Sequence, residues 1–164
     1  MPIDGTVMAL VDIRIAVDAD VPAIARVVHD AFAGFIPLIG RAPWPMFQNY
    51  PARVAQGAVW VLTEGGAIVG VAVLQFNDDH LFIETIAVAP SQQRRGHGRR
   101  LLDFVEGESR RRGYDETRLQ MHLTMARSIP LYREHGYTEY ARSEEDGYHR
   151  VYLRKRLRDA DACR

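Results

Sequence analysis

The stretch from Leu81 to Arg112 reads LFIETIAVAPSQQRRGHGRRLLDFVEGESRRR. Its apolar first part has the length of a strand and ends at Pro90, where a short polar turn with glycines follows. Beyond the turn, apolar and small residues recur at the spacing of one helix face, at Gly98, Leu101, Leu102, Val105 and Ser109. We therefore expect a strand over Leu81–Ala89 and a helix that begins near Gly96 and ends at Gly113.

Positive charge is concentrated at the N-terminal end of this predicted helix, in Arg94, Arg95, Arg99 and Arg100. Free N–H groups already make that end positive, so each arginine there costs a few tenths to about 1 kcal/mol. The arrangement becomes favourable when an anion binds, because Gly96 and Gly98 let a phosphate approach the backbone amides. A solvated arginine-rich surface is the alternative interpretation. The turn is a candidate phosphate site.

The hexapeptide Gln93–Gly98 resembles the Q/R-x-x-G-x-G/A signature of the GNAT acyl-coenzyme A dependent N-acyltransferases, in its usual place between a strand and a helix. Downstream, Leu131–Tyr137 is similar to the "LYxxxGF" segment of that family. The resemblance spans about Ile13 to Arg156. It implies an α/β (α+β) GNAT fold with a central mixed, mostly antiparallel sheet of six or seven strands and about four flanking helices.

The same resemblance implies that acetyl-CoA is the co-substrate. Backbone amides of the turn would hold the pyrophosphate, the arginines would meet the adenosine phosphate, and one strand edge would pair with the pantetheine. The cofactor-binding residues expected on this basis are Ile86, Ala87, Val88, Gln93, Arg94, Arg95, Gly96, His97, Gly98, Arg99 and Arg100. The chain departs from the family where Met125 and Ser128 replace the usual Asn and Ala, which puts one polar pantetheine contact in doubt.

Two side chains are candidate catalytic groups. Strand alternation puts Glu84 on one face with Phe82 and Ile86, where burial would raise the carboxyl pKa towards that of a general base. Pairing with an arginine, or access to solvent, is the alternative interpretation. The resemblance implies that Glu84 deprotonates the acceptor amine and that Tyr132 protonates the departing thiolate, although a helix tyrosine is also an ordinary packing residue.

The segment Gly34–Pro51 combines four prolines and two glycines with large apolar residues, which predicts an ordered but irregular segment. The resemblance implies that it helps to form the acceptor site, with Phe35, Arg41, Trp44, Met46 and Tyr50 as candidate contacts. Packing alone is an equally good interpretation for each of them. His122 is a further candidate, as a substrate contact or alternative base. The acceptor is expected to be a small-molecule or protein amine.

The remaining elements follow from periodicity and turn residues. A stripe formed by Val21, Ile24, Ala25, Val28, Phe32 and Phe35 predicts an amphipathic helix after a strand at Ile13–Val17, with Asp18 or Asp20 as its cap. Hairpins are expected at Gly65-Gly66 and Asp146-Gly147, and a short helix near Ser128. We expect a flexible leader at residues 1–12, one domain at 13–156 and a polar tail at 157–164.

Composition excludes several functions. Lys+Arg 21 equals Asp+Glu 21, so no global field favours nucleic acid, and the arginine-rich turn lacks aromatic side chains for base stacking. With a lone Cys163, and no signal or run of about 18 apolar residues, we expect a cytoplasmic protein that does not span a membrane. No metal is expected, whereas a homodimer is compatible with the family. An acyl-CoA binding or sensing module without transferase activity is the alternative function.

Overall fold

The computed structural model describes residues 10–157, without the side chain of Ala126. Its centre is a seven-stranded sheet in the order β1-β2-β3-β4-β5-β7-β6, in which β4 and β5 are parallel and the other neighbours antiparallel. The strands are β1 (Val11–Ile15), β2 (Val59–Glu64), β3 (Ala67–Phe76), β4 (Leu81–Val88), β5 (Glu116–His122), β6 (Thr138–Glu145) and β7 (Tyr148–Arg156). The predicted mixed, mostly antiparallel sheet is confirmed.

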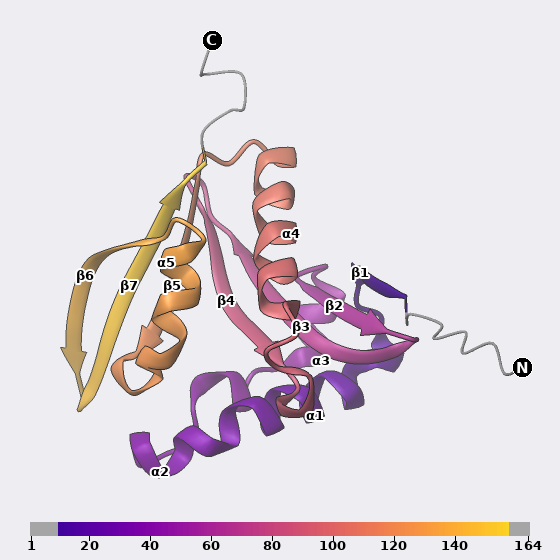
Figure 1. Ribbon diagram of the computed structural model, residues 1–164, viewed down its shortest axis with the longest axis horizontal. Helices are drawn as coiled ribbons and strands as arrows, with labels where there is room; N and C mark the ends of the chain where they lie inside the picture. Colours follow the sequence, from indigo (N-terminus) through magenta and orange to yellow (C-terminus); the bar gives the residue numbers. More distant parts are fainter. Residues whose placement is uncertain (1–9, 158–164) are drawn as a thin grey trace, which may run out of the picture.

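Helices cover both faces of this sheet (Figure 1). The α-helices are α1 (Val21–Phe32), α2 (Ile36–Ile39), α3 (Tyr50–Ala55), α4 (His97–Arg111) and α5 (Ile129–Glu134). Short 3₁₀ turns are η1 (Asp18–Asp20), η2 (Ala33–Phe35), η3 (Trp44–Met46), η4 (Pro90–Gln92) and η5 (Leu123–Ser128). The predicted helix after the glycine turn is therefore confirmed, with Gly96 as its N-cap and Gly113 at a φ of 84° beyond its end.

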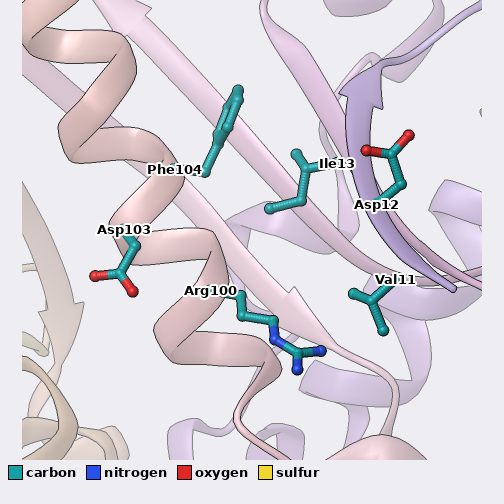
Figure 2. A pocket seen from close by; sticks show the side chains of 6 residues that line it. All are labelled: Val11, Asp12, Ile13, Arg100, Asp103 and Phe104. Carbon is teal, nitrogen blue, oxygen red and sulfur yellow. The ribbon is translucent and has the colours of Figure 1, made fainter. Parts of the chain in front are cut away.

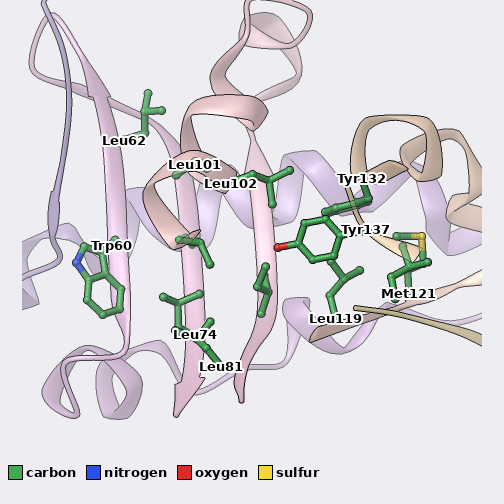
Figure 3. Close-up of a cluster of buried hydrophobic side chains, with 14 of the residues drawn as sticks. Trp60, Leu62, Leu74, Leu81, Leu101, Leu102, Leu119, Met121, Tyr132 and Tyr137 are labelled. Atoms are coloured by element: carbon green, nitrogen blue, oxygen red, sulfur yellow. The ribbon is translucent and has the colours of Figure 1, made fainter. Parts of the chain in front are cut away.

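The core has two parts, one on each face of the sheet. On the α4 face, Leu101, Leu102 and Val105 pack against alternate residues of the central strands, and Tyr132 of α5 joins the same cluster (Figure 3). On the other face, α1 and α3 pack against the side chains that point the opposite way, such as Val71 and Val73. The alternation of apolar residues along the strands thus supplies both halves of the core.

Two neighbouring strands separate at the middle of the sheet. Pairing of β4 with β5 is confined to Leu81–Ile83 and Thr117–Leu119, and the strands diverge beyond that point (Figure 1). From Glu84 to Val88, β4 therefore has a backbone edge that β5 does not cover. The other edge of β4 continues to pair with β3 as far as Val88.

A bulge interrupts β4 at Glu84. The register with β3 shifts there, so that Ile83 pairs with Leu74 while Thr85 pairs with Val73. An extra residue reverses the alternation of faces. Ile86 consequently packs on the α4 face, whereas Glu84 reaches α3 on the other face. The prediction that Glu84 and Ile86 share a face was therefore wrong.

Several predicted boundaries differ from the structure. The first strand begins at Val11, inside the predicted leader, and Leu157 of the predicted tail is buried in the core. The rest of the leader and tail lies outside the described residues. Neither the Asp20 nor the Ser128 side chain makes a capping hydrogen bond to its helix. The Asp20 carboxylate instead accepts hydrogen bonds from Arg14 and from the backbone N–H of Val17.

The first helix follows its predicted stripe with one exchange. Ile24 and Val28 are buried, but Val27 takes the inward position expected for Ala25, which is exposed. The helical run Asp18–Ile39 has a mean hydropathy of 1.3 over an 18-residue window, so by length and composition it would suffice to cross a membrane. Its buried side chains pack against β3 and β4.

Candidate active site

A cleft of about 1410 Å³ opens where β4 and β5 diverge. It is bounded by β4, the turn before α4, β5, α5, the start of β7, and the segment after α1. Of the residues predicted from the sequence, the following line it: Phe35, Arg41, Trp44, Glu84, Ile86, Ala87, Val88, Gln93, Arg94, Gly96, His97, Gly98, Arg99, His122 and Tyr132. The fold thus brings together side chains from most of the chain.

One end of the cleft is the turn that leads into α4. Arg94 and Gly96 both have positive φ, at 64° and 84°, and no side chain caps the helix. The N–H groups of its first turn therefore have no intrahelical partner. Such a concave run of backbone N–H groups, at the positive end of a helix of 15 residues, suits a phosphate group.

The four arginines near this turn have different surroundings. Arg95 pairs with Glu64, whose carboxylate lies 3.2 Å from its guanidinium, and Arg99 pairs with Glu134. Arg100 lines a second groove on the far side of α4, between this helix and β1 (Figure 2). Arg94 lines the cleft and has no ion-pair partner among residues 10–157. Neither Arg95 nor Arg100 is among the cleft-lining residues.

Glu84 has an ion-pair partner that is distant in the sequence. Its carboxylate lies 2.8 Å from Nη2 of Arg53 and accepts a hydrogen bond of 2.9 Å from Nε2 of Gln48. Both side chains of the ion pair are less than one-fifth exposed. The alternative interpretation, an arginine-paired carboxylate, is therefore what the structure contains, although Glu84 also lines the cleft.

Tyr132, on α5, also lines the cleft. Its side chain is 9% exposed, and its ring packs edge to face on Tyr137 at a centroid distance of 5.8 Å. Burial raises the pKa of the Tyr132 phenol to about 12. Within the described part of the chain its hydroxyl makes no hydrogen bond. A neutral hydroxyl without a protein partner is available to a bound molecule.

The acceptor end of the cleft is only partly as predicted. Phe35 and Trp44 line it together with Phe47, and Trp44 is 68% exposed. Tyr50, predicted as a substrate contact, instead packs in the core on the α1 face and donates a 2.6 Å hydrogen bond to the carbonyl of Pro45. It does not line the cleft, and neither does Met46.

His122 lines the cleft at the end of β5. Its Nδ1 accepts a hydrogen bond of 3.1 Å from the backbone N–H of Thr124, so the neutral ring carries its proton on Nε2. Burial, together with the nearby His149, Arg150 and Arg41, lowers the pKa of His122. A neutral ring with Nδ1 occupied is a hydrogen-bond donor to the cleft, which argues against His122 as the alternative base.

Besides Phe47, sequence reasoning missed four residues near the acceptor end: Gln48, Arg53, Tyr148 and Arg150. The first two contact Glu84, and the last two line the cleft. None stands within a recognisable motif. Contacts of α3 and the segment before it with β4, and the pairing of β7 with β5, bring them to the site. Among the described residues, no group of His, Cys, Asp and Glu side chains is arranged to hold a metal ion.

Comparison with known proteins identifies the family. The family model described as "Acetyltransferase (GNAT) family" matches residues 24–137, which is more than half of the chain. This chain belongs to the GNAT acetyltransferase family. The match includes the turn before α4 and the segment with Tyr132, the two places where the sequence resembles the family.

Individual relatives agree with this membership. A curated GNAT relative, the [ribosomal protein bS18]-alanine N-acetyltransferase of Escherichia coli K12, is 35% identical over 78 residues, which are 48% of this chain and 53% of that enzyme. The chain thus spans about half the length of the curated relatives it matches. The crystal structure of the Escherichia coli ribosomal-protein-S18-alanine N-acetyltransferase has a TM-score of 0.75 at 24% identity, covering 94% of this chain and 99% of that one.

Two further GNAT structures were solved with coenzyme. The yncA structure, a putative acetyltransferase from Salmonella typhimurium with acetyl-CoA, has a TM-score of 0.71 at 25% identity and covers 93% of this chain and 96% of its own. The PaiA N-acetyltransferase of Thermoplasma acidophilum, in complex with coenzyme A, has a TM-score of 0.78 at 14% identity, covering 90% and 99% of the two chains. These likenesses agree with the GNAT fold of this chain.

Proposed function

We propose that this protein is an N-acetyltransferase that moves the acetyl group of acetyl-CoA directly to a primary amine, while both substrates are bound. The observation that carries the proposal is the uncovered edge of β4, which runs from Glu84 to Val88 into the uncapped start of α4. A long ligand with a phosphate at one end and amides along its arm fits such a site, because an edge strand pairs with amides and a helix N-terminus binds anions.

The residues present suit coenzyme A as this ligand. Backbone N–H groups between Arg94 and Arg99 would bind the pyrophosphate, and Arg94 is available for a further phosphate. The backbone of Ile86, Ala87 and Val88 would pair with the pantetheine arm. Gln93 donates a hydrogen bond of 3.1 Å from its amide to the Val88 carbonyl, which fixes the strand end against the turn.

The chemistry needs one proton acceptor and one proton donor. The amine nitrogen attacks the thioester carbonyl carbon, so that a C–N bond forms and the C–S bond breaks. Glu84 takes the proton that the amine loses, directly or through water, and Tyr132 gives its phenolic proton to the departing sulfur. Exchange with solvent then restores both groups.

Arg53 affects the first of these roles. The Arg53 guanidinium, 2.8 Å from the Glu84 carboxylate, occupies part of the hydrogen-bonding capacity of that carboxylate. In return, the pair orients Glu84 at the cleft wall. Gln48 and Arg53 act as positioning residues in this proposal, while Glu84 takes the proton.

Two measurements test the proposal. Calorimetric titration with acetyl-CoA is expected to show micromolar binding, weakened with dephospho-coenzyme A, with NADH as the unrelated nucleotide control. Thiol release from acetyl-CoA is then followed across a panel of small amines and peptide N-termini. Absence of acetyl-CoA binding would overturn the proposal, and tight binding without turnover of any amine would favour the acyl-CoA binding module instead.

A further inference from the structure

Charge is unevenly distributed along the cleft. The described residues that line it include five arginines, Arg41, Arg94, Arg99, Arg127 and Arg150, and one carboxylate, that of Glu84. Arg94 lies in the turn before α4 and Arg99 in the first turn of α4, both at the proposed coenzyme end. Arg53 already balances the negative charge of Glu84, so the acceptor end of the cleft carries an excess of positive charge.

The Tyr148 ring at the acceptor end is surrounded by three hydrogen-bond donors, those of Arg41, Arg150 and His122. The Cζ atom of Arg41 lies 3.4 Å from the centroid of the Tyr148 ring, and that of Arg150 lies 5.3 Å from it. The His122 ring packs edge to face on the same ring at 5.8 Å. The three come from the loop after α2, from β7 and from β5, so this Tyr148 cluster joins three parts of the fold.

Most donors of this cluster have no protein acceptor. Arg41 makes one hydrogen bond within residues 10–157, to the backbone carbonyl of Asp146 at 3.3 Å. Arg150 has a single carboxylate neighbour in the same range, Glu145 at 3.8 Å, whose side chain is largely exposed. A guanidinium presents five N–H donors in a planar fork that matches a carboxylate, so both retain donors for a ligand.

Other charged groups nearby do not fill this role. Glu144 and Glu145 lie at the end of β6 and Asp146 on the turn to β7, and none of them lines the cleft. Stacking on an aromatic ring fixes the plane of a guanidinium and leaves its edge free for hydrogen bonds. The Tyr148 cluster is therefore an oriented set of donors that faces the acceptor end of the cleft.

We infer that the acceptor is an amine that carries a carboxylate, of the α-amino acid class, with an apolar side chain. Arg41 and Arg150, with the Nε2–H of His122, bind the carboxylate and determine specificity, while Phe35, Trp44 and Phe47 contact the apolar part. A polyamine is disfavoured, since its additional positive charges would meet these arginines. The inference rests on the proposed function and names its substrate class.

The test compares amines that differ only at the carboxyl group. Alanine, leucine and phenylalanine are each assayed beside their amides, with spermidine and a short peptide amide as further acceptors, and kcat/KM is taken from thiol release. The amides have the larger fraction of free amine at neutral pH, so basicity alone would favour them. We expect at least tenfold higher kcat/KM for one or more of the acids than for the matching amide.

Variants assign the preference to the cluster. Arg41→Gln and Arg150→Gln are each expected to lower the acid-to-amide ratio of kcat/KM at least tenfold. Arg142→Gln is the matched control, because Arg142 pairs with Glu139 on β6 and does not line the cleft. Calorimetric binding of acetyl-CoA to each variant checks that the fold and the coenzyme site are intact.

The outcomes separate the inference from the proposed function. Equal or faster acetylation of the amides, of spermidine or of the peptide amide overturns the inference and leaves an N-acetyltransferase. A ratio that is unchanged in both arginine variants also overturns it. If acetyl-CoA binds but none of these amines is acetylated, the α-amino acid class is excluded, whereas loss of acetyl-CoA binding in the wild-type protein overturns the proposed function.

Discussion

The carboxylate of Glu84 lies 2.8 Å from the guanidinium of Arg53, which is itself held by a 3.1 Å hydrogen bond to the carbonyl of Leu74. The bulge in β4 makes this contact possible, because it turns Glu84 towards α3 while the strand continues. A potential base is thus fixed at the point where β4 leaves β5. The pair fixes the direction of this carboxylate at the cleft wall.

Replacing the carboxylate tests its role as a base. Glu84→Gln keeps the shape of the side chain but removes the proton acceptor, so we expect kcat/KM to fall by about a hundredfold or more near pH 7. The loss should shrink at alkaline pH, where more of the acceptor amine is already unprotonated. Binding of acetyl-CoA, measured by calorimetry, should not change.

Two control variants accompany this change. Glu139→Gln removes a carboxylate of β6 that is paired with Arg142 outside the cleft, and should leave turnover intact. Arg53→Gln removes the partner but keeps the carboxylate, and should retain more activity than Glu84→Gln. Equal losses of activity in Glu84→Gln and Arg53→Gln, with matching losses of thermal stability, would mean that the ion pair is purely structural.

Removing the Tyr132 hydroxyl should slow the departure of the thiol. We expect Tyr132→Phe to lower kcat by roughly ten- to a hundredfold with little change in KM for acetyl-CoA. Because burial raises the pKa of the phenol to about 12, Tyr132 should stay protonated and cause no loss of activity up to about pH 10. Steady-state rates across pH check both statements.

Tyr137→Phe is the matched control for that variant. Tyr137 packs against Tyr132 and its hydroxyl lies 2.8 Å from Oγ1 of Thr117, in the core and outside the cleft. Loss of the Tyr137 hydroxyl should lower the unfolding free energy by about 1 kcal/mol and leave kcat unchanged. A larger effect on kcat from Tyr137→Phe than from Tyr132→Phe would contradict the assigned role.

Replacing each of two glycines of this segment by alanine should change the stability of the protein in opposite directions. Gly96 has a φ of 84°, so Gly96→Ala should cost about 1 kcal/mol of stability and weaken acetyl-CoA binding by distorting the turn. Gly107 lies inside α4 with open space around it, so Gly107→Ala should add about 0.5–1 kcal/mol and leave binding unchanged. Thermal unfolding and calorimetry measure both; unchanged binding in Gly96→Ala would argue against coenzyme at this turn.

The contact between Arg14 and Asp20 predicts a dependence of stability on pH. Hydrogen bonds from Arg14, with a further one from the Val17 backbone, hold the pKa of the Asp20 carboxyl below its ordinary value of 3.8. A carboxyl whose pKa is lower in the folded state stabilises the fold above the unfolded pKa and loses this contribution as pH falls through the folded pKa.

Asp20→Asn should therefore lower the unfolding free energy by about 1 kcal/mol near pH 7, and the difference from wild type should shrink as pH falls below 3.8 and through the lower folded-state pKa. Denaturant unfolding at several pH values gives this difference. Asp18→Asn is the control, because the neighbouring Asp18 is exposed and its side chain makes no hydrogen bond within the described range. A difference that persists at low pH would show that the amide disturbs packing instead.

Most of the fold could be predicted because its signals are local. Gly65-Gly66 and Asp146-Gly147 adopt the positive φ that their hairpins require, and the helix after the glycine turn begins and ends at the expected glycines. The family signature lies in two short segments whose conformation is set by neighbouring residues. Predicted strand ends differed by a few residues, since pairing with another strand decides where a strand stops.

The sequence by itself determined the alternation of strands and helices, the turn before α4, and the family. Only the tertiary structure decided that Glu84 pairs with Arg53, that Arg100 faces away from the cleft, that Tyr50 is buried, and that Arg41 and Arg150 meet at Tyr148. The reason is physical: periodicity and turn conformation depend on residues a few positions apart. The partner of a charged side chain depends on a strand register and on packing between segments far apart in the chain.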